Sequence, residues 1–379
     1  MKVFSSSLVI CLLILLLSCQ SSQQRVSYFS GFKTIQITDS SRLYKSDSPQ
    51  TYYLHYRPID IDMWYPADSS PTDSVLVFGN MLSLFEQRAN FYTDSHAGDG
   101  FSTQLAKSFT DFFHCSSVEK ILASPTQSRK DTKAAAGKFP LVLYMASYNG
   151  MGYENIQLLE NLAKNGYIVA SFNSIGRYPG DMTMQQADLM EQVSDAAFGL
   201  KYLKKLPEVD SSRIAVVGYS WGGLAGVVLG MTHTDIDAVI SLDGSEFHHY
   251  GLDAKEDSLF NQISHDFVSN KTPYLRLESS STEDQATIDS VYNFNTVLQG
   301  PKQIYKILNT SHGDFSVYPT IVKQSGGCPA EKSYKIITQL VTGYCSQILK
   351  QTPPNAFTDT IRKEEGRTLK TILTNYHMP

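Results

Sequence analysis

The pattern of apolar and polar positions is most regular after residue 56. Residues 57–65 alternate, with Ile59, Ile61 and Met63 on one side, which predicts a strand with one buried face. Farther along, short uninterrupted apolar runs predict strands that are buried on both faces. These runs are residues 141–146, 167–172, 214–217, 238–242, 274–277 and 303–308.

Segments with helical spacing of apolar residues separate several of these predicted strands. They are residues 154–165, 188–206 and 224–231. Gly166 stands where a C-cap glycine belongs, and Pro207 ends the second segment. Strands that alternate with helices indicate βαβ units and a mostly parallel sheet with helices on both faces. We therefore predict an α/β fold in a single domain, residues 31–379, with a helical excursion around 81–136.

Less regular segments interrupt and follow this pattern. Residues 68–73 and 124–138 resemble loops, and residues 81–113 are mixed but mostly helix-like. Residues 336–349 are amphipathic and predict a packing helix, and a helix-like tail follows Pro353 and Pro354.

The first 18 residues predict a targeting segment. Lys2 precedes an apolar run at residues 8–17 that is too short to span a bilayer comfortably. Leu16, Leu17 and Ser18 then lead into Cys19, a sequence that resembles a bacterial lipobox in which Cys19 is lipidated. Residues 19–30 would form a flexible tether. We expect a lipoprotein that a lipid anchors to a membrane of the cell envelope; an ordinary signal peptide is the alternative.

Composition excludes several other classes of protein. The formal net charge is −5 and basic residues form no stripe, so nucleic acid is not an expected partner. Of the five cysteines, Cys115, Cys328 and Cys345 lie beyond the lipobox; an exported protein could pair two of them, and the sequence leaves the pairing open. His248 and His249 are adjacent, and adjacent histidines rarely converge on one ion. No metal or cofactor is predicted.

The strongest chemical signal is the sequence Gly218-Tyr219-Ser220-Trp221-Gly222-Gly223. It fits the G-x-S-x-G nucleophile elbow and stands between a buried predicted strand and an apolar predicted helix. An elbow serine sits on a tight turn, which requires small neighbours, and the following helix N-terminus favours negative charge. Ser220 is therefore the predicted nucleophile of an α/β-hydrolase fold.

A serine nucleophile needs a base, and the expected chain order is serine, acid, histidine. Of nine histidines, His312 follows the last predicted strand, where ligands bind in such sheets. For the acid we favour Asp243, which directly follows residues 238–242 and would orient the imidazole. Glu278, Glu283 and Asp284 follow the next strand and remain alternatives. The backbone N–H of Trp221 is the expected first oxyanion donor, and the loop after residues 141–146 should supply the second.

Four segments resemble the bacterial dienelactone-hydrolase-like proteins and the related platelet-activating-factor acetylhydrolases. They are residues 57–66, with Arg57-Pro58 and Trp64-Tyr65-Pro66, residues 139–144, residues 162–169, and the elbow at 218–223. The resemblance implies that the triad acid is Asp243, that the base is His312, and that Tyr148 supplies the second oxyanion N–H. The family loop reads His-Gly-x at this point, and here Ala146-Ser147-Tyr148 has neither the His nor the Gly.

The resulting expectation is a serine esterase that works through an acyl-enzyme without a cofactor. The acetylhydrolase resemblance points to esters with short acyl chains. Two alternatives remain: a peptidase of the same fold, and a catalytically silent lipoprotein that binds a ligand in the same cleft. The oligomeric state does not follow from the sequence.

Overall fold

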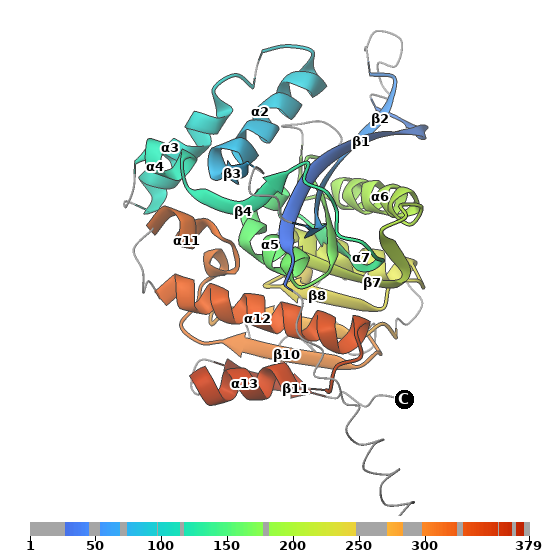
Figure 1. Cartoon of the computed structure of the whole chain (residues 1–379), viewed down its shortest axis with the longest axis vertical. Coiled ribbons are helices and arrows are strands. Elements are labelled where there is room, and N and C mark those ends of the chain that lie inside the picture. Colours follow the sequence, from blue (N-terminus) through green and yellow to red (C-terminus); the bar gives the residue numbers. More distant parts are fainter. Residues whose placement is uncertain are drawn as a thin grey trace, which may run out of the picture.

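The computed structural model of the 379-residue chain describes residues 27–44, 54–68, 74–96, 98–113, 117–176, 182–247, 271–282, 298–323, 329–354, 356–365 and 369–374. Within these ranges, one mixed sheet runs through the molecule (Figure 1). Its strands follow the order β11-β10-β9-β8-β7-β5-β6-β2-β1-β4-β3. Their bounds are β1 Phe29–Leu43, β2 Tyr56–Ala67, β3 Val75–Val77, β4 Pro125–Lys130, β5 Phe139–Met145, β6 Ile168–Phe172, β7 Val209–Tyr219, β8 Ala238–Leu242, β9 Tyr274–Glu278, β10 Lys302–Ile307 and β11 Leu369–Thr374.

The middle of the sheet is parallel. Strands β6, β5, β7, β8, β9 and β10 pair in parallel, one after the other. Antiparallel pairing appears toward both edges, where β2 joins β6 and β11 joins β10. Because neighbouring parallel strands end at the same edge, the loops after β5, β7, β8 and β10 meet there.

The helices continue this alternation along the chain. They are α2 Phe78–Thr93, α3 Phe101–Phe113, α4 Val118–Leu122, α5 Ile156–Lys164, α6 Gln186–Leu203, α7 Trp221–Thr232, α11 Tyr318–Lys323, α12 Pro329–Leu349 and α13 Ala356–Glu365. Single 3-10 turns occur at η1 Gly152–Asn155, η2 Ser245–Phe247 and η3 His312–Phe315. No helix among the described residues is long and apolar enough to cross a membrane.

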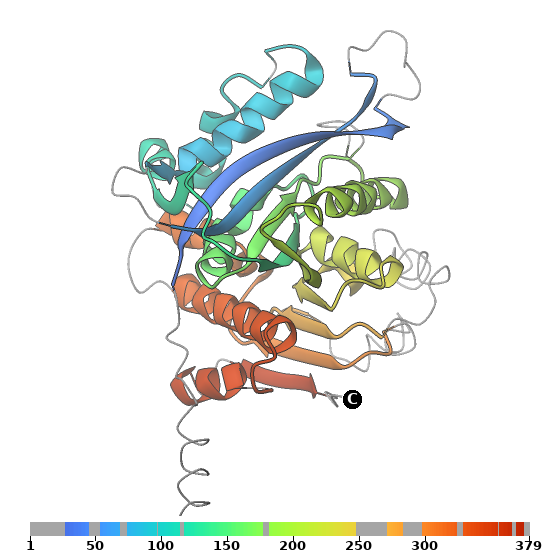
Figure 2. The same ribbon diagram turned by 45° about the vertical axis from the view of Figure 1, so that its right-hand side comes forward.

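Two apolar cores cover the two faces of the sheet. Val142 and Tyr144 of β5 belong to the core under α5 and α12, whereas Leu141, Leu143 and Met145 belong to the core under α6 and α7. Successive side chains of a strand point to opposite faces, and here the side chains on both faces of β5 are apolar. Figure 2 shows α12 on one side of the sheet and α6 with α7 on the other. The predicted fold class, a mostly parallel sheet with helices on both faces, is confirmed.

Several predicted boundaries agree closely with the structure. The run at 238–242 is β8, and the predicted strands at 141–146, 274–277 and 303–308 differ from β5, β9 and β10 by one or two residues. The predicted helix at 188–206 corresponds to α6, which ends three residues earlier, and that at 336–349 forms the last two thirds of α12. The bounds of these strands and helices follow from the local spacing of apolar residues, which can be read directly from the sequence.

Four strands were not predicted: β1, β3, β4 and β11. The strand β1 begins at Phe29, so the last two residues assigned to the tether already pair with β2. Residues 125–130, interpreted as part of a loop, form β4, which pairs with β1 and β3. The tail after Pro354 begins with a helix, α13, and then returns to the sheet as β11. The excursion is helical through α2, α3 and α4 and ends in β4.

Candidate active site

Ser220 lies in the turn between β7 and α7. Its backbone has φ 55° and ψ −122°, a conformation that non-glycine residues rarely adopt. Three backbone hydrogen bonds hold it: the Ser220 N–H donates to Leu242 O (3.1 Å), and its own carbonyl accepts from Gly223 N (2.9 Å) and Ser245 N (2.9 Å). The strained turn is thus fixed by the ends of β8 and α7.

The glycines on both sides of Ser220 permit this turn. A Cβ at Gly218 would overlap the carbonyl of Gly222, and one at Gly222 would overlap the carbonyl of Met145. These neighbours are backbone atoms that cannot swing aside. The tight turn of the elbow therefore requires glycine at position 218, and its packing against the end of β5 requires glycine at position 222.

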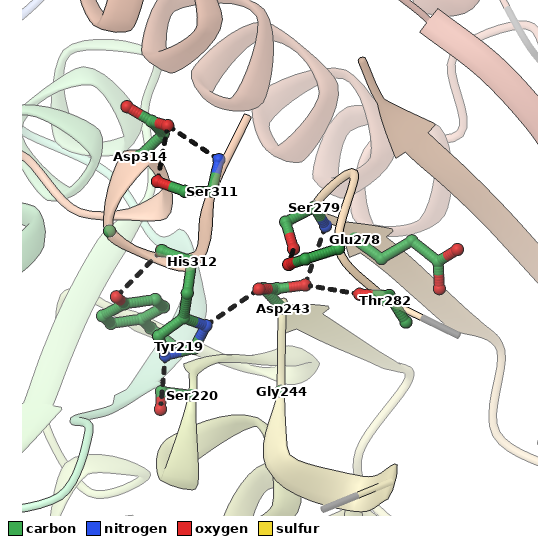
Figure 3. A network of polar contacts seen from close by, with 12 residues as sticks. Tyr219, Ser220, Asp243, Gly244, Glu278, Ser279, Thr282, Ser311, His312 and Asp314 are labelled. Carbon is green, nitrogen blue, oxygen red and sulfur yellow. Dashed lines mark hydrogen bonds and ion pairs between the residues drawn. The ribbon is translucent and has the colours of Figure 1, made fainter. Parts of the chain in front are cut away.

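His312 reaches Ser220 from the loop after β10. Its Nε2 lies 2.9 Å from Ser220 Oγ (Figure 3). Ser311, just before His312, and Asp314, two residues after it, form a capping box at the start of η3. Asp314 Oδ2 accepts from Ser311 N (2.8 Å) and Oγ (2.9 Å), and the Ser311 side chain accepts from the backbone N–H of Asp314. Tyr219 stacks on the imidazole with ring centroids 5.1 Å apart, and its hydroxyl donates to His312 O (3.1 Å). The backbone of His312 is thus held in place, and its imidazole ring packs against Tyr219.

Asp243 directly follows β8 and lies on the other side of the imidazole. Its Oδ2 is 2.8 Å from His312 Nδ1. Its Oδ1 accepts from the backbone N–H of Ser279 (2.8 Å) and from Thr282 Oγ1 (3.2 Å), as Figure 3 shows. The backbone φ of Asp243 is 43°, another left-handed position. Both carboxylate oxygens are therefore held by groups from different strand ends.

Electrostatics favour the ionised form of Asp243. Burial by itself would raise the pKa of this carboxyl, but the hydrogen bond to His312, the positive charge of Arg276 and the Ser279 N–H outweigh burial and lower the pKa to about 2. An ionised carboxylate can only accept hydrogen bonds, so His312 Nδ1 must carry the proton that points to Asp243. In neutral His312 the Nε2 lone pair then faces Ser220 Oγ.

The rival acid at position 278 lies elsewhere. Glu278 makes ion pairs with Arg276 Nε (3.3 Å) and Lys306 Nζ (3.5 Å), and Figure 3 shows its side chain directed away from His312. Glu283 and Asp284 lie outside the described residues, as do Cys19, Cys115, Cys328, His248 and His249. Of the three candidate cysteines, Cys345 is a buried free thiol in α12. Among the described residues, no cluster of potential metal ligands occurs.

The two predicted oxyanion donors are neighbours. Trp221 is the first residue of α7, so its N–H lies at the positive end of the helix dipole. Tyr148, in the loop after β5, contacts the Trp221 ring edge-on at 6.4 Å between centroids, and its hydroxyl donates to Met182 O (2.7 Å). The structure thus brings the loop that carries Tyr148 beside the elbow.

Three residues near the site were not singled out from the sequence. Tyr219 supports His312, and Arg276 donates to Gly244 O (3.2 Å) and to Glu246 Oε2 (2.8 Å), which holds the turn after Asp243. Glu154 is buried under the loop that contains Tyr148. For Tyr219 the only signal was its place inside the elbow. Arg276 gave none, because its partners lie 30 and 32 positions away, and Glu154 gave none, because it meets Ser147 only through the fold of the loop between them.

Comparison with known proteins bears on this site. The family described as "BAAT / Acyl-CoA thioester hydrolase C terminal" matches residues 197–317, which is less than half of the chain but includes Ser220, Asp243 and His312. No curated protein matches the sequence. Among solved structures, the ferulic acid esterase from Streptomyces cinnamoneus is similar at a TM-score of 0.65, with 18% sequence identity, over 93% of this chain and 98% of that chain. The chain has the α/β-hydrolase fold.

The location of the site agrees with this fold. In open α/β sheets, ligands bind beyond the carboxyl ends of the strands, and in an α/β-hydrolase the elbow serine is exposed at that edge. Ser220, Asp243 and His312 follow β7, β8 and β10 respectively. The His312 side chain is 43% exposed, whereas that of Asp243 is 7% exposed. An incoming molecule can therefore reach the imidazole and the serine, while the carboxylate stays shielded.

Proposed function

We propose that the chain is a serine hydrolase that cleaves carboxylic esters through an acyl-enzyme on Ser220. One observation carries the proposal: a continuous relay in which Ser220 Oγ lies 2.9 Å from His312 Nε2 and Asp243 Oδ2 lies 2.8 Å from His312 Nδ1. In this arrangement the serine, the base and the residue that orients the base have the mutual geometry that acyl transfer requires.

The first half-reaction forms the acyl-enzyme. Ser220 Oγ attacks the ester carbonyl carbon while its proton moves to His312 Nε2, which leaves a tetrahedral oxyanion and an imidazolium. The ionised Asp243 stabilises that imidazolium through Nδ1. The oxyanion then collapses, the carbon–oxygen bond to the alcohol breaks, and His312 returns the proton to the leaving oxygen.

The second half-reaction restores the enzyme. Water attacks the acyl carbon and transfers a proton to His312 Nε2, the bond to Ser220 Oγ breaks, and the imidazolium protonates Oγ again. During both steps the backbone N–H groups of Trp221 and Tyr148 stabilise the oxyanion. A donor of this kind contributes about 10²–10³-fold to kcat in related mechanisms.

The substrate class is a short-chain oxygen ester, with thioesters as the second candidate. The acetylhydrolase resemblance of the sequence supports small acyl groups, and the similar solved structure is a ferulic acid esterase. The match of residues 197–317 to an acyl-CoA thioester hydrolase region favours the thioester alternative. The proposed chemistry is the same for both, because the bond that breaks in the first step is the bond from the acyl carbon to oxygen or sulfur.

The test is hydrolysis of p-nitrophenyl acetate, butyrate and octanoate, and of acetyl- and butyryl-CoA, by the chain from residue 20 onward. Ser220→Ala should remove turnover of every substrate that the wild type cleaves, and a fluorophosphonate probe should label the wild type alone. Activity that survives in S220A would refute the proposal. Labelling of Ser220 without turnover of any ester would favour the peptidase alternative. Neither labelling nor turnover would favour a silent binding protein.

We also propose that the mature protein is a lipoprotein anchored through Cys19 to a cell-envelope membrane. The support is the sequence Leu16-Leu17-Ser18-Cys19 after an apolar run. Mass spectrometry of the mature N-terminus should find diacylglycerol on Cys19 in the wild type, and Cys19→Ala should move the protein from the membrane to the soluble fraction. An unmodified N-terminus in the wild type would refute this proposal.

A further inference from the structure

A buried carboxylate lies directly beneath the loop that carries Tyr148. Glu154 is 1% exposed and lies in η1, the 3-10 turn that leads into α5. Its Oε1 accepts from the backbone N–H of Ser147 (2.8 Å) and from Tyr144 OH (2.8 Å), and its Oε2 accepts from Ser147 Oγ (2.5 Å). Two of these three hydrogen bonds thus go to Ser147, the residue before Tyr148.

The loop folds closely around this carboxylate. Gly150 N donates to Ser147 O (2.8 Å), which closes a tight turn, and Ser174 N donates to Gly150 O (3.1 Å). Within the turn, Asn149 has φ 52°. A Cβ at Gly150 would lie 2.5 Å from Glu154 Oε2, so the backbone of the loop packs directly against the carboxylate. Glu154 therefore contacts the loop of residues 147–150 at both of its ends.

The contact between Ser147 and Glu154 lies where this sequence differs from the family that it resembles. The resemblance aligns the family's His-Gly-x loop with Ala146-Ser147-Tyr148, so Ser147 stands in place of the glycine. Ser147 has a side chain that glycine does not, and that side chain binds Glu154. Because both the backbone N–H and the hydroxyl of Ser147 bind the same carboxyl group, Ser147 is held in one orientation.

We propose that Glu154 is a positioning residue of the oxyanion hole: it fixes Ser147 through the backbone and the hydroxyl, and thereby aims the Tyr148 N–H at the substrate oxyanion. This inference rests on the proposed serine hydrolase function. The Tyr148 N–H belongs to the peptide that joins Ser147 to Tyr148, so rotation of Ser147 would turn the N–H away. Glu154 itself contacts no reacting atom.

The surroundings of Glu154 are consistent with this role. Burial raises the pKa of its carboxyl to about 7, against the opposing effect of the Ser147 hydrogen bonds and the His312 charge. Tyr144, Tyr153, Tyr219 and Tyr318 lie around it, and burial together with the Glu154 charge raises the pKa of each of these phenols. The carboxylate is thus kept in an apolar, aromatic environment next to the site.

Glu160 offers a matched control. It is also 1% exposed, its Oε1 accepts from a backbone N–H (Gln127, 2.7 Å) and a serine hydroxyl (Ser128, 2.6 Å), and burial raises its pKa to about 7 as well. Its partners lie on β4, away from the elbow. Removal of either carboxylate should cost similar stability, but only Glu154 should affect oxyanion stabilisation.

The experiment compares Glu154→Ala, Glu154→Gln and Glu160→Ala in the same protein used for the ester assays. For E154A, kcat should fall about 10²-fold or more with KM within threefold, because the oxyanion forms only in the transition state. Affinity for a trifluoromethyl ketone, which binds as a tetrahedral anion, should fall in parallel. E154Q should recover kcat to within tenfold of the wild type, since its amide oxygen still accepts from Ser147 N. E160A should keep kcat within threefold.

A second readout does not depend on activity. Amide hydrogen exchange in a peptide covering residues 146–152 should rise at least tenfold in E154A and stay unchanged in E160A. Unchanged exchange there, or equal loss of kcat in E154A and E160A, would overturn the inference. If E154A does not fold, Ser147→Ala takes its place, with kcat expected to fall about tenfold and normal kcat counting against the role. An inactive wild type would refute the proposed function, and the exchange data would still decide whether Glu154 holds the loop.

Discussion

The substitution Asp243→Asn gives the sharpest test of the relay. It keeps the size of the side chain and removes its charge. The asparagine oxygen should stay on the Ser279 N–H and Thr282 Oγ1, because turning the amide would place its NH₂ against those two donors. The NH₂ group then faces His312 Nδ1, which must give up its proton to accept. His312 would carry its proton on Nε2 and could not take one from Ser220.

The magnitude follows from the contacts that change. Only the tautomer of His312 with its proton on Nδ1 can act as the base. In the variant this tautomer loses the charge-assisted hydrogen bond of 2.8 Å to Asp243, which is worth about 1.5–3 kcal/mol. That tautomer also has two donors facing each other in a site where the Asp243 side chain is 7% exposed, which costs about 1–3 kcal/mol more. The total corresponds to a fall in kcat of about 10²–10⁴-fold. KM should change little, because Asp243 does not contact the substrate.

The assay is steady-state hydrolysis of p-nitrophenyl acetate, with the folded fraction of each variant measured by circular dichroism. Glu278→Gln is the matched control, since Glu278 ends the neighbouring strand β9 and binds Arg276 and Lys306 instead of His312. Its activity per folded molecule should stay within about fivefold of the wild type, as expected for a group outside the relay. If D243N kept more than a tenth of wild-type kcat, or if E278Q lost more than D243N, the assignment of the acid would be wrong.

Two further predictions concern the elbow and the buried carboxylates. Gly222→Ala should reduce kcat more than 100-fold and lower the melting temperature, because the new Cβ overlaps backbone carbonyls and overpacking costs about 1–3 kcal/mol. Gly313→Ala is the control, since a Cβ there meets nothing within 4 Å. In the same activity and calorimetric assays it should change neither kcat nor the melting temperature. For Glu160, the pKa is raised from 4.5 to about 7, so ionisation should destabilise the wild type as pH rises through this range. Urea unfolding at pH 4 and pH 8 should therefore show a shift of up to about 3 kcal/mol in favour of Glu160→Gln; no shift would mean that the carboxyl is not held protonated.

Where a local pattern decided the structure, the sequence was sufficient. The apolar run at 238–242 is β8, and the helical spacing at 188–206 corresponds to α6. The elbow residues also act locally: Gly218 and Gly222 permit the turn at Ser220, and the strand and helix that flank it are both apparent from periodicity. These features depend on residues only a few positions apart.

The strands at the sheet edges required tertiary contacts. The residues of β4, Pro125–Lys130, are largely polar, and only pairing with β1 and β3 makes them a strand. In the same way β11 extends the sheet beside β10 after a helix, and its sequence alone did not separate it from a helical tail. For β1 the sequence does carry a local signal, since Ile35 and Ile37 alternate with polar residues.

At the site, the sequence determined the nucleophile and the base as candidates, and only the tertiary structure decided which groups meet. Asp243 follows β8 and Glu278 ends β9, both at the carboxyl ends of parallel strands, and nothing local distinguishes them as partners of His312. The structure does so because the left-handed backbone of Asp243 turns its carboxylate toward His312, 69 positions away, whereas Arg276 and Lys306 hold Glu278. Glu154 and its contact with Ser147 were likewise invisible in the sequence. A pattern of residues records what each segment buries, but the distance between two side chains depends on how the whole sheet is assembled.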